Sequence, residues 1–539
     1  MPGRNAELEI TYEDDPRVVQ EQRTEDYAAH AVPVTARVGR FKLLMSSWSL
    51  LSAMVWLFYG ALVAGMVGTG QALIGLVATV LVYSVLGWVL TGWGTRWGLN
   101  STLLSRRMFG AYGAVLTALL LAATTLYYAV FESSVLAQAF RIRFGGPGLH
   151  WWYLIVVVAL LPLMLGSVQT WMDRLNAYLL PLYVVGMVAA VVVAAVKYGN
   201  GSQWFHFAGS IPAAARPAPG WLMAFALYMG IWINMPITVE FSRLGRPQDL
   251  RFHQHVTFGW VFYIWLFLLN GLAGIYLTST VLPAGSAGET GVVQALVKVL
   301  GVWGVLLIVV TQVRINTLNY YVSSTNWGRL AQRLAGLRLP RIAWVVAVAV
   351  VAFLLMLTDV FSYLQSAMNW QGVFLVSWVG IVVTHFVTRP AERRSGPEFR
   401  PGRLKAVTPG LAVWIAASGI GIWLTRSSRS LPTLSSLAPL VALGVSVVLY
   451  ALVLAFGPSS LVERGADPRD EVADPQAARI ACTVCSRSYT AVEMDRDPAR
   501  DGAAVCTGCA ETDRVFLRAA RSQGPGAGAA ETEPSAARV

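Results

Sequence analysis

The sequence predicts an all-α membrane protein that crosses the bilayer twelve times. Of its 539 residues, 55% are hydrophobic and only 13% are charged, a composition typical of polytopic membrane proteins. The 29 acidic residues are also segregated: 8 lie within residues 1–42, 13 within 458–539, and the other 8 in the long stretch between. We therefore expect a membrane domain over residues 43–457, flanked by a polar N-terminal tail and a polar C-terminal region.

Each predicted span is a run of about 20 apolar residues, which as a helix can cross a hydrocarbon core about 30 Å thick. Residues 1–42 lack a basic stretch followed by an apolar run, so we expect no cleaved signal peptide. The twelve spans are 45–67, 71–93, 111–140, 151–168, 175–197, 220–241, 256–281, 298–325, 341–358, 361–387, 408–425 and 435–457.

The positions of Lys and Arg predict the orientation. With both termini inside, the N-terminal tail and the inner loops hold 23 of these residues, and the outer loops hold 7. Cytoplasmic loops carry the excess of positive charge, so we expect a plasma (inner) membrane protein with cytoplasmic N- and C-termini. The net charge of +12 requires no nucleic-acid partner, because Lys and Arg near spans of the lipid bilayer reflect orientation.

The sixth span, from Trp221 to Arg243, is interrupted near its middle by Gly230, Asn234 and Pro236. Lipid cannot satisfy the backbone groups that a proline frees, so such a break must face protein or a water-filled cavity. Transporters place substrate sites at breaks of this kind. A simple kink is the alternative, since Gly and Pro are common in membrane helices.

The first span carries Gly60 at mid-depth among small residues, in the position that Gly230 and Pro236 take five spans later. Two interrupted helices at matching positions of two five-helix halves indicate an inverted repeat, with a substrate site between them at the membrane midplane. The alternative role for Gly60 is close helix packing.

Glu132 is the only carboxylate deep inside a predicted span. Tyr128 lies one turn before it on the same helical face, with Thr124 a further turn back. An aromatic plate followed by a hydrogen-bonding group suits a flat heterocycle. Burial disfavours the charged form of the carboxyl, which makes Glu132 a candidate proton carrier. A structural ion pair is the alternative.

Span eight carries a polar stripe on one helical face, formed by Gln312, Asn316, Asn319 and Ser323. We expect this stripe to line a cavity, the alternative being hydrogen bonds to neighbouring helices. Arg314 lies about 160° around the helix from Asn316 and is expected outside the same site. Its charge needs a partner, and Glu132 is one candidate.

Three segments resemble the nucleobase:cation symporter family 1, and particularly its purine-cytosine permeases: VEFSRLGRPQD after the broken span, NTLNYYVSSTN on span eight, and SRRMFGAYGA before span three. The resemblance covers residues 40 to 457. It implies a leucine-transporter-type fold of five plus five inverted helices and two further helices. It also implies import of a nucleobase or related heterocycle, such as cytosine, a purine, a hydantoin or allantoin, by alternating access coupled to a cation gradient.

The resemblance also implies site residues. Two rings would sandwich the base while amide and carboxyl groups read its edge. With Asn319 added from the polar stripe, the predicted substrate-binding residues are Tyr128, Glu132, Trp232, Asn234, Asn316 and Asn319.

The coupling cation is left open between Na⁺ and H⁺. In the family, sodium is held by span-one carbonyls and span-eight hydroxyls; Thr311 matches one hydroxyl, but the adjacent position is Val310. The predicted coupling residues are therefore Thr311 and Glu132. The family's acidic residue after span six is Glu240, which with Arg243 is interpreted as a structural or gating pair at the cytoplasmic end, or else as part of a solvated loop.

All four cysteines form one motif, C-x2-C-x20-C-x2-C, made of Cys482, Cys485, Cys506 and Cys509. This spacing is typical of a structural Zn²⁺ site in a small zinc-ribbon-like unit, and cytoplasmic thiols stay reduced. An iron site or a redox-active set is the alternative. We expect a linker over 458–478, a zinc-binding unit over 479–519 and a disordered tail over 520–539. Residues 458–539 contain 10 basic and 13 acidic residues, so nucleic-acid binding is not expected.

Two classes of function remain. The first is a secondary active transporter, and the second is a non-transporting membrane receptor or regulator that signals through the zinc-binding unit. No enzyme is expected, since no motif of a hydrolase, metalloprotease or phosphate-binding loop occurs in a suitable context.

Overall fold

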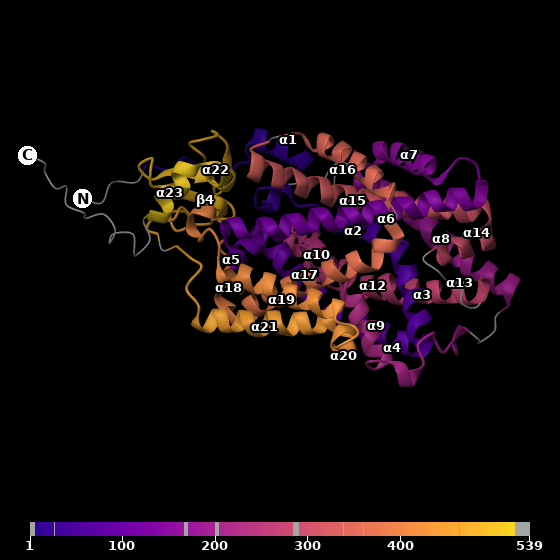
Figure 1. Cartoon of the computed structure of the whole chain (residues 1–539). Coiled ribbons are helices and arrows are strands. Elements are labelled where there is room, and N and C mark those ends of the chain that lie inside the picture. The colour runs from indigo at the N-terminus through magenta and orange to yellow at the C-terminus, as the bar shows by residue number, and fades with distance from the viewer. Residues whose placement is uncertain are drawn as a thin grey trace, which may run out of the picture.

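Helices dominate the computed structural model and pack into an elongated bundle, with the described N- and C-terminal segments at one end (Figure 1). The two terminal segments form a small unit there, which we call the cap: an N-terminal arm, residues 6–38, and a C-terminal unit, residues 464–522. The structure describes residues 6–25, 27–165, 171–199, 204–283, 290–337, 339–358, 360–462 and 464–522. Of the predicted disordered tail, residues 520–539, the part from residue 523 on lies outside this description, whereas residues 520–522 belong to a helix, Arg514–Ser522.

The bundle is a chain of α-helices with short 3₁₀ and π segments between them. Its first half contains α2 (Arg40–Ser47), η2 (Trp48–Ser52), α3 (Val55–Val67), α4 (Thr69–Trp97), α5 (Ser101–Gly113), α6 (Val115–Phe144), α7 (Leu149–Leu160), η3 (Leu161–Leu165), α8 (Met172–Tyr198) and η5 (Ala213–Ala215). Next come α9 (Gly220–Met229), α10 (Asn234–Ser242), η6 (Pro247–Asp249), α11 (Leu250–Phe252), η7 (His253–Thr257), α12 (Trp260–Tyr263), η8 (Ile264–Leu269), α13 (Asn270–Val281), α14 (Gly291–Leu300) and α15 (Val302–Ala335). The last part contains α16 (Arg341–Met356), α17 (Val360–Thr388), α18 (Pro390–Ser395), η9 (Pro401–Arg403), α19 (Pro409–Arg426), α20 (Pro432–Ser436) and α21 (Ala438–Phe456).

Each of the twelve predicted spans coincides with a helix or a run of consecutive helices. In the described part of the chain, seven helical segments are long and apolar enough to cross a membrane, or nine if each of two bent pairs forms one span. The segments Leu149–Leu165 and Arg341–Met356 are apolar but shorter. These helices indicate a multi-pass membrane protein, and the number of twelve crossings stays a prediction.

Two spans are broken. Helices α9 and α10 meet at 44°, and the segment Arg40–Ser52 meets α3 at 41°. The first of these breaks lies where the sequence predicts it. Pro236 falls in the first turn of α10, where its missing N–H leaves no helical hydrogen bond unmade.

The break in the first span is not at Gly60, so that prediction was wrong in position. Helix α3 runs through Gly60 without interruption, and the chain breaks between Ser52 and Val55. A Cβ at position 60 would lie 2.4 Å from the carbonyl oxygen of Gly271 on α13. Gly60 therefore lets two helix backbones approach closely, as small residues commonly do in membrane proteins.

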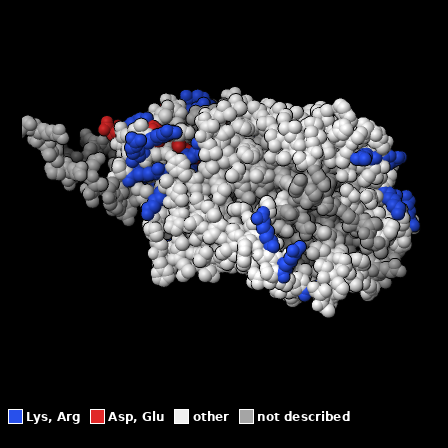
Figure 2. All heavy atoms as spheres, viewed as in Figure 1, with Lys and Arg blue, Asp and Glu red and all other residues white. Residues whose placement is uncertain are grey.

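Helices α6 and α15 pack against each other at the centre of the bundle. Over their most apolar stretches 67% and 72% of the residues are buried inside the protein, against 22% for α8 and 17% for α21. Around this pair, α3 packs on α13, α4 packs on α9 and α10, and α17 packs on α19 and α21. Most of the visible flank carries no charge, and the Asp and Glu residues seen in that view all lie on the cap (Figure 2).

The cap joins the two ends of the chain. Strand β1 (Ile10–Thr11) pairs with β2 (Arg479–Ala481), which pairs with β3 (Ser488–Thr490), and all pairs are antiparallel. A second sheet contains β4 (Met494–Asp497) and β5 (Ala503–Cys506). The cap is completed by α1 (Pro16–Glu25), η1 (Val34–Ala36), η10 (Ala491–Glu493), α22 (Thr507–Thr512) and α23 (Arg514–Ser522). The pairing of β1 with β2 has no counterpart in the sequence predictions.

Candidate functional site

A small internal cavity lies where the two broken spans meet. One wall is the break between η2 and α3, the opposite wall is the break between α9 and α10, and helices α6 and α15 close the sides. Its volume is ≈ 20 Å³, about enough for one water molecule. The polar side chains that line it are Thr125, Tyr128, Glu132, Asn234 and Asn319.

Glu132 connects α6 to the break of the first span. Its Oε1 accepts a hydrogen bond from the backbone N–H of Val55 at 3.3 Å, the first residue of α3. Its Oε2 is buried without a hydrogen-bond partner in the described structure. One carboxylate oxygen therefore caps the helix that resumes after the break, and the other is available to a ligand or a proton.

Asn234 presents an unused amide on the opposite wall. The residue is only 1% exposed, and neither its Nδ2 nor its Oδ1 has a hydrogen-bond partner among the described residues. A buried amide left unpaired costs free energy unless a ligand or water satisfies it. The position at the start of α10, directly after the break, aims this amide into the cavity.

Of the other residues predicted for the site, Tyr128 and Asn319 line the cavity, whereas Trp232 and Asn316 lie beside it. Tyr128 lines it and accepts a hydrogen bond from Gln371 Nε2 on α17 at 3.1 Å. Trp232 is buried behind the wall, with its ring edge-to-face against Tyr83 at 6.1 Å. Asn316 donates to Ser133 Oγ on α6 at 3.4 Å. Trp232 and Asn316 are thus not among the residues that line the cavity in this conformation.

The polar stripe of span eight mostly faces α6 instead of open space. Asn319 alone of its four members lines the cavity, and its amide also donates to Asn316 Oδ1 at 3.4 Å. Gln312 faces the Glu132 carboxyl, and Ser323 Oγ donates to the backbone oxygen of Ala122 at 3.1 Å. Hydrogen bonding to a neighbouring helix, the alternative for this stripe, therefore accounts for most of it.

Arg314 is fully buried on the far side of α15, and Glu132 is not its partner. Its Nη2 donates to the backbone oxygen of Trp48 at 2.6 Å, its Nε donates to Ser52 Oγ at 3.1 Å, and its Nη1 donates to the backbone oxygen of Asn176. No carboxylate pairs with it in the part of the chain that the structure describes. The guanidinium thus satisfies oxygens at both ends of η2, Trp48 O and Ser52 Oγ, and one on α8, Asn176 O, next to the break of the first span.

Two further backbone oxygens of this break, those of Leu50 and Leu51, accept from side-chain donors of the protein. Leu51 accepts from the Tyr183 hydroxyl at 3.1 Å and from Asn270 Nδ2 at 2.7 Å. Leu50 accepts from the indole N–H of Trp56 at 2.6 Å. A break at membrane depth is tolerated only when such groups find partners inside the protein.

Thr311 lies outside the cavity lining. Its hydroxyl donates to the backbone oxygen of Ile308, one turn back on α15, at 2.7 Å. The predicted role in cation coupling stays untested.

Glu240 and Arg243 lie at the cap end of the bundle and are buried, with 4% and 0% exposure. Their charged groups are 3.9 Å apart, and Glu240 also lies 3.8 Å from Arg329 on α15. Glu240 accepts from the backbone N–H of Ser101 at 3.1 Å. A solvated loop is therefore excluded, and Glu240 joins α10 to α5 and α15.

A second candidate site lies in the cap. The sulfur atoms of Cys482, Cys485, Cys506 and Cys509 all lie within 4.8 Å of one another. Tetrahedral Zn²⁺ with bonds of 2.3 Å would place its sulfurs about 3.8 Å apart. The backbone N–H of Cys506 donates to Cys482 Sγ at 3.3 Å, and that of Cys509 donates to Cys506 Sγ at 3.5 Å. Such bonds support negatively charged sulfur ligands, so the donor set fits a tetrahedral soft-metal site.

Comparison with known proteins identifies the fold. No protein-family model and no curated protein matches the sequence. The chain is similar to Mhp1, a nucleobase-cation-symport-1 family transporter solved in a closed conformation with bromovinylhydantoin bound, with a TM-score of 0.62 and 16% identity over 81% of this chain and 97% of that one. The chain has the fold of this transporter.

Two further structures agree. The inward-facing conformation of Mhp1 matches with a TM-score of 0.64 and 16% identity, over 82% of this chain and 96% of that one. A Na⁺-coupled sialic acid symporter in a substrate-bound, outward-open state matches with a TM-score of 0.55 and 11% identity, over 82% and 95% of the two chains. The leucine-transporter-type architecture expected from the resemblance is therefore confirmed at the level of the fold.

Sequence reasoning missed the residues that hold the first break in place. Tyr183 and Asn270, which donate to Leu51 O, are single polar residues on separate apolar spans, so no periodic pattern marks them. A usable signal is present in residues 46 to 52, where several serines occur in an otherwise apolar run. Ser49 Oγ and Ser52 Oγ donate to backbone oxygens three residues earlier, at 2.9 and 3.0 Å, as serines do where regular helix gives way.

Proposed function

We propose that this protein is a secondary active transporter that imports a nucleobase or a related flat heterocycle, such as cytosine, a purine, a hydantoin or allantoin, by alternating access. The observation that carries the proposal is the meeting of two broken spans at a cavity with an unpaired amide, Asn234, and an unpaired carboxyl oxygen, Glu132 Oε2. Broken helices facing a midplane cavity are the substrate sites of transporters with this architecture.

The residue chemistry supports a ring-shaped substrate with donors and acceptors at its edge. Asn234 and Asn319 would read that edge, since an amide both donates and accepts, while Glu132 would accept from an N–H and Tyr128 would stack on the ring. Trp232 and Asn316 would join after a shift of α9, α10 or α15. The present volume of ≈ 20 Å³ is far below the roughly 150 Å³ that holds a benzene ring in a protein core, so substrate entry requires the walls to separate.

The proposed coupling ion is H⁺, carried by Glu132. Na⁺ would need several oxygen ligands, which transporters of this architecture supply from backbone carbonyls at a helix break. Here the carbonyls of Trp48, Leu50 and Leu51 accept from protein donors, and the Arg314 guanidinium already places a positive charge beside them. We infer that Arg314 takes the place of a bound cation, and that the Thr311 hydroxyl only forms hydrogen bonds within α15 and binds no ion.

In the cap, the four cysteines would hold a structural Zn²⁺, which supplies cross-linking of two short hairpins that have little core of their own. The cap end would face the cytoplasm, in line with the positive charge of its loops and with the reduced thiols that zinc requires. The bundle would cross a plasma membrane twelve times, with the five-plus-five repeat followed by α19 and α21.

The deciding experiment is uptake into proteoliposomes of labelled purines, pyrimidines, hydantoins and allantoin, each under an imposed pH gradient or an imposed Na⁺ gradient. Accumulation of one of these compounds supports the transporter. Saturable binding without flux would instead favour the receptor that signals through the zinc-binding unit.

Asn234→Ala is expected to weaken substrate binding without destabilising the protein. Loss of hydrogen bonds to the substrate should raise Kd by roughly 10- to 100-fold. Thermal stability without substrate should stay equal or rise, because the variant removes a buried amide that has no partner. Asn176→Ala is the matched control: this buried amide donates to Met172 O and Thr317 Oγ1, so its loss should lower stability. A lower melting temperature in Asn234→Ala itself would contradict the assignment.

Removal of the proposed zinc is expected to unfold the cap alone. Structural Zn²⁺ sites contribute on the order of 10 kcal/mol to small domains, so Cys506→Ser or prolonged chelation should remove one zinc per chain and expose residues 464–522 to proteolysis. Metal analysis and limited proteolysis measure both effects, and re-added Zn²⁺ should restore protection only in the chelated wild type. A protein that contains no zinc yet resists proteolysis would refute the site.

A further inference from the structure

The cap connects two groups of helices at one end of the bundle. On one side, the N-terminal arm is bonded to the ends of α4 and α10: Val32 N–H donates to Gly98 O at 2.9 Å, Val38 N–H donates to Leu244 O at 2.8 Å, and Arg37 donates to Thr95 O. Helix α10 is one half of the broken span that forms one wall of the cavity, and α4 packs on both halves of that span.

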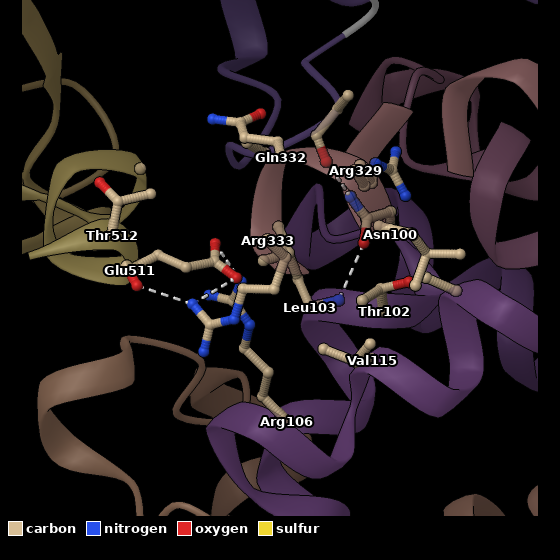
Figure 3. Close-up of a pocket in the computed structure, with 15 residues that line it drawn as sticks. Asn100, Thr102, Leu103, Arg106, Val115, Arg329, Gln332, Arg333, Glu511 and Thr512 are labelled. Atoms are coloured by element: carbon tan, nitrogen blue, oxygen red, sulfur yellow. Dashed lines mark hydrogen bonds and ion pairs between the residues drawn. The ribbon is translucent and has the colours of Figure 1, made fainter. Parts of the chain in front are cut away.

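On the other side, the C-terminal unit forms ion pairs with α5 and α15 through one residue, Glu511, and Arg521 lies over the Tyr112 ring of α5 at 5.2 Å. Glu511 Oε2 lies 2.6 Å from Arg106 Nη2, its Oε1 lies 2.8 Å from Arg333 Nη1, and its backbone oxygen accepts from the same Arg333 nitrogen at 2.8 Å. Figure 3 shows Glu511 reaching from α22 to both guanidinium groups. The Arg333 and Arg106 side chains are 7% and 4% exposed, so these charge-assisted bonds are well shielded from water.

The arm and the C-terminal unit are in turn bonded firmly to each other. Besides the pairing of β1 with β2, the ring of His30 stacks on Tyr489 at 4.3 Å and its Nδ1 lies 2.7 Å from Glu493 Oε2. Arg479 binds Asp14 at 2.8 Å. The cap therefore acts as one body with three attachments. The arm holds the ends of α4 and α10 and accepts from Asn100, just before α5. The C-terminal unit holds the loop before α19 through Arg400, which pairs with Asp467, and holds α5 and α15 mainly through Glu511.

Alternating access in this architecture requires one group of helices to rock against the other. Opening at the cap end would move Gly98 and Leu244 away from Arg106 and Arg333, and a rigid cap cannot follow both. Glu511 is the attachment with the fewest bonds. Its place is set by the cysteine site, because α22 starts directly after Cys506 and Glu511 is two residues beyond Cys509.

We propose that the cap is a lock on the transport cycle: Glu511, held in position by the metal-bound cysteine unit, ties α5 and α15 to the arm on α4 and α10, and the substrate cavity opens at this end only when Glu511 leaves Arg106 and Arg333. The proposal rests on the proposed transporter function for its physiological meaning. Loss of metal would release the lock, so the cap would adjust transport to the state of the cysteine site.

The test measures opening directly and without substrate. Ile237, which lines the cavity, is replaced by cysteine, and a small thiol reagent is added from the cap side of oriented vesicles. Mass spectrometry follows alkylation of position 237. With Glu511→Gln the rate should rise roughly tenfold or more, since a neutral amide cannot hold two buried guanidinium groups as a carboxylate does. Zinc content should be unchanged, which shows that the unit itself stays folded.

Glu471→Gln is the matched control, because Glu471 pairs with Arg496 inside the same unit and does not reach the bundle. Its alkylation rate should equal that of the parent. Arg333→Gln breaks the same contact from the other side and should reproduce the effect of Glu511→Gln even if that variant folds poorly. Unchanged alkylation in both variants would overturn the lock. Alkylation does not depend on transport. A chain that fails to transport would refute the proposed function, and the alkylation rates would still decide whether Glu511 locks the bundle.

Discussion

Glu132→Gln is expected to abolish the substrate accumulation that a proton gradient drives, while exchange of labelled for unlabelled substrate continues. Glutamine keeps an oxygen for the Val55 N–H, which Glu132 Oε1 accepts at 3.3 Å, so the break between η2 and α3 should keep its shape. It cannot take up or release a proton. One proton crossing a one-unit pH gradient supplies about 1.4 kcal/mol, enough for roughly tenfold accumulation, and this factor should fall to about one in the variant.

Tyr128→Phe serves as the control within the same cavity. It removes the hydroxyl that accepts from Gln371 and leaves the carboxyl intact, so substrate affinity should change while proton-driven accumulation persists. The measurement compares net uptake with counterflow in proteoliposomes at fixed internal pH. If Glu132→Gln still accumulates substrate under a pH gradient, or if the wild type follows a Na⁺ gradient and ignores pH, proton coupling through Glu132 is wrong.

The site features that could be predicted from the sequence belong to residues whose placement costs free energy in most environments. Pro236 would remove a hydrogen bond from the interior of a helix, and the structure breaks the sixth span just before it. Glu132 cannot remain unpartnered in lipid, and it lies at the cavity between the breaks. The spacing of the four cysteines predicts a metal site, and their sulfur atoms lie within 4.8 Å of one another. In each case the residue type is tolerated in only a few structural environments, so its own chemistry is enough to predict where it lies in the fold.

The remaining features depend on partners that are remote in sequence. The first span breaks without a proline, and what holds the break open is a set of donors from other helices, among them Tyr183 and Asn270. A glycine at position 60 is consistent with either a helix break or a close packing contact. Its proximity to Gly271 in the structure shows that it serves packing. Likewise Ile10 lies opposite Ile480 in the cap sheet, a pairing that a two-residue strand cannot predict.

Arg314→Ser should make the protein depend on Na⁺ for stability, which the wild type does not. Removing the guanidinium leaves Trp48 O, Asn176 O and Ser52 Oγ without their donor. Unpaired buried acceptors cost about 1–3 kcal/mol each, so the loss in Na⁺-free buffer should reach at least about 3 kcal/mol. The vacated space is surrounded by oxygens at a helix break, the ligands that a hard cation prefers.

Thermal unfolding in detergent is measured with NaCl and with choline chloride at equal ionic strength, so that only a specific effect of Na⁺ registers. The melting temperature of Arg314→Ser should be lower than that of the wild type in choline and should recover in part with NaCl, whereas the wild type should give the same value in both. Arg96→Ser, at an exposed position near the end of α4, should behave as the wild type. If Na⁺ instead stabilises the wild type, a sodium site coexists with Arg314 and the guanidinium does not replace the cation. If Arg314→Ser is destabilised equally in both salts, Arg314 is a structural cross-link between η2 and α8 alone, and the choice of coupling ion rests on Glu132.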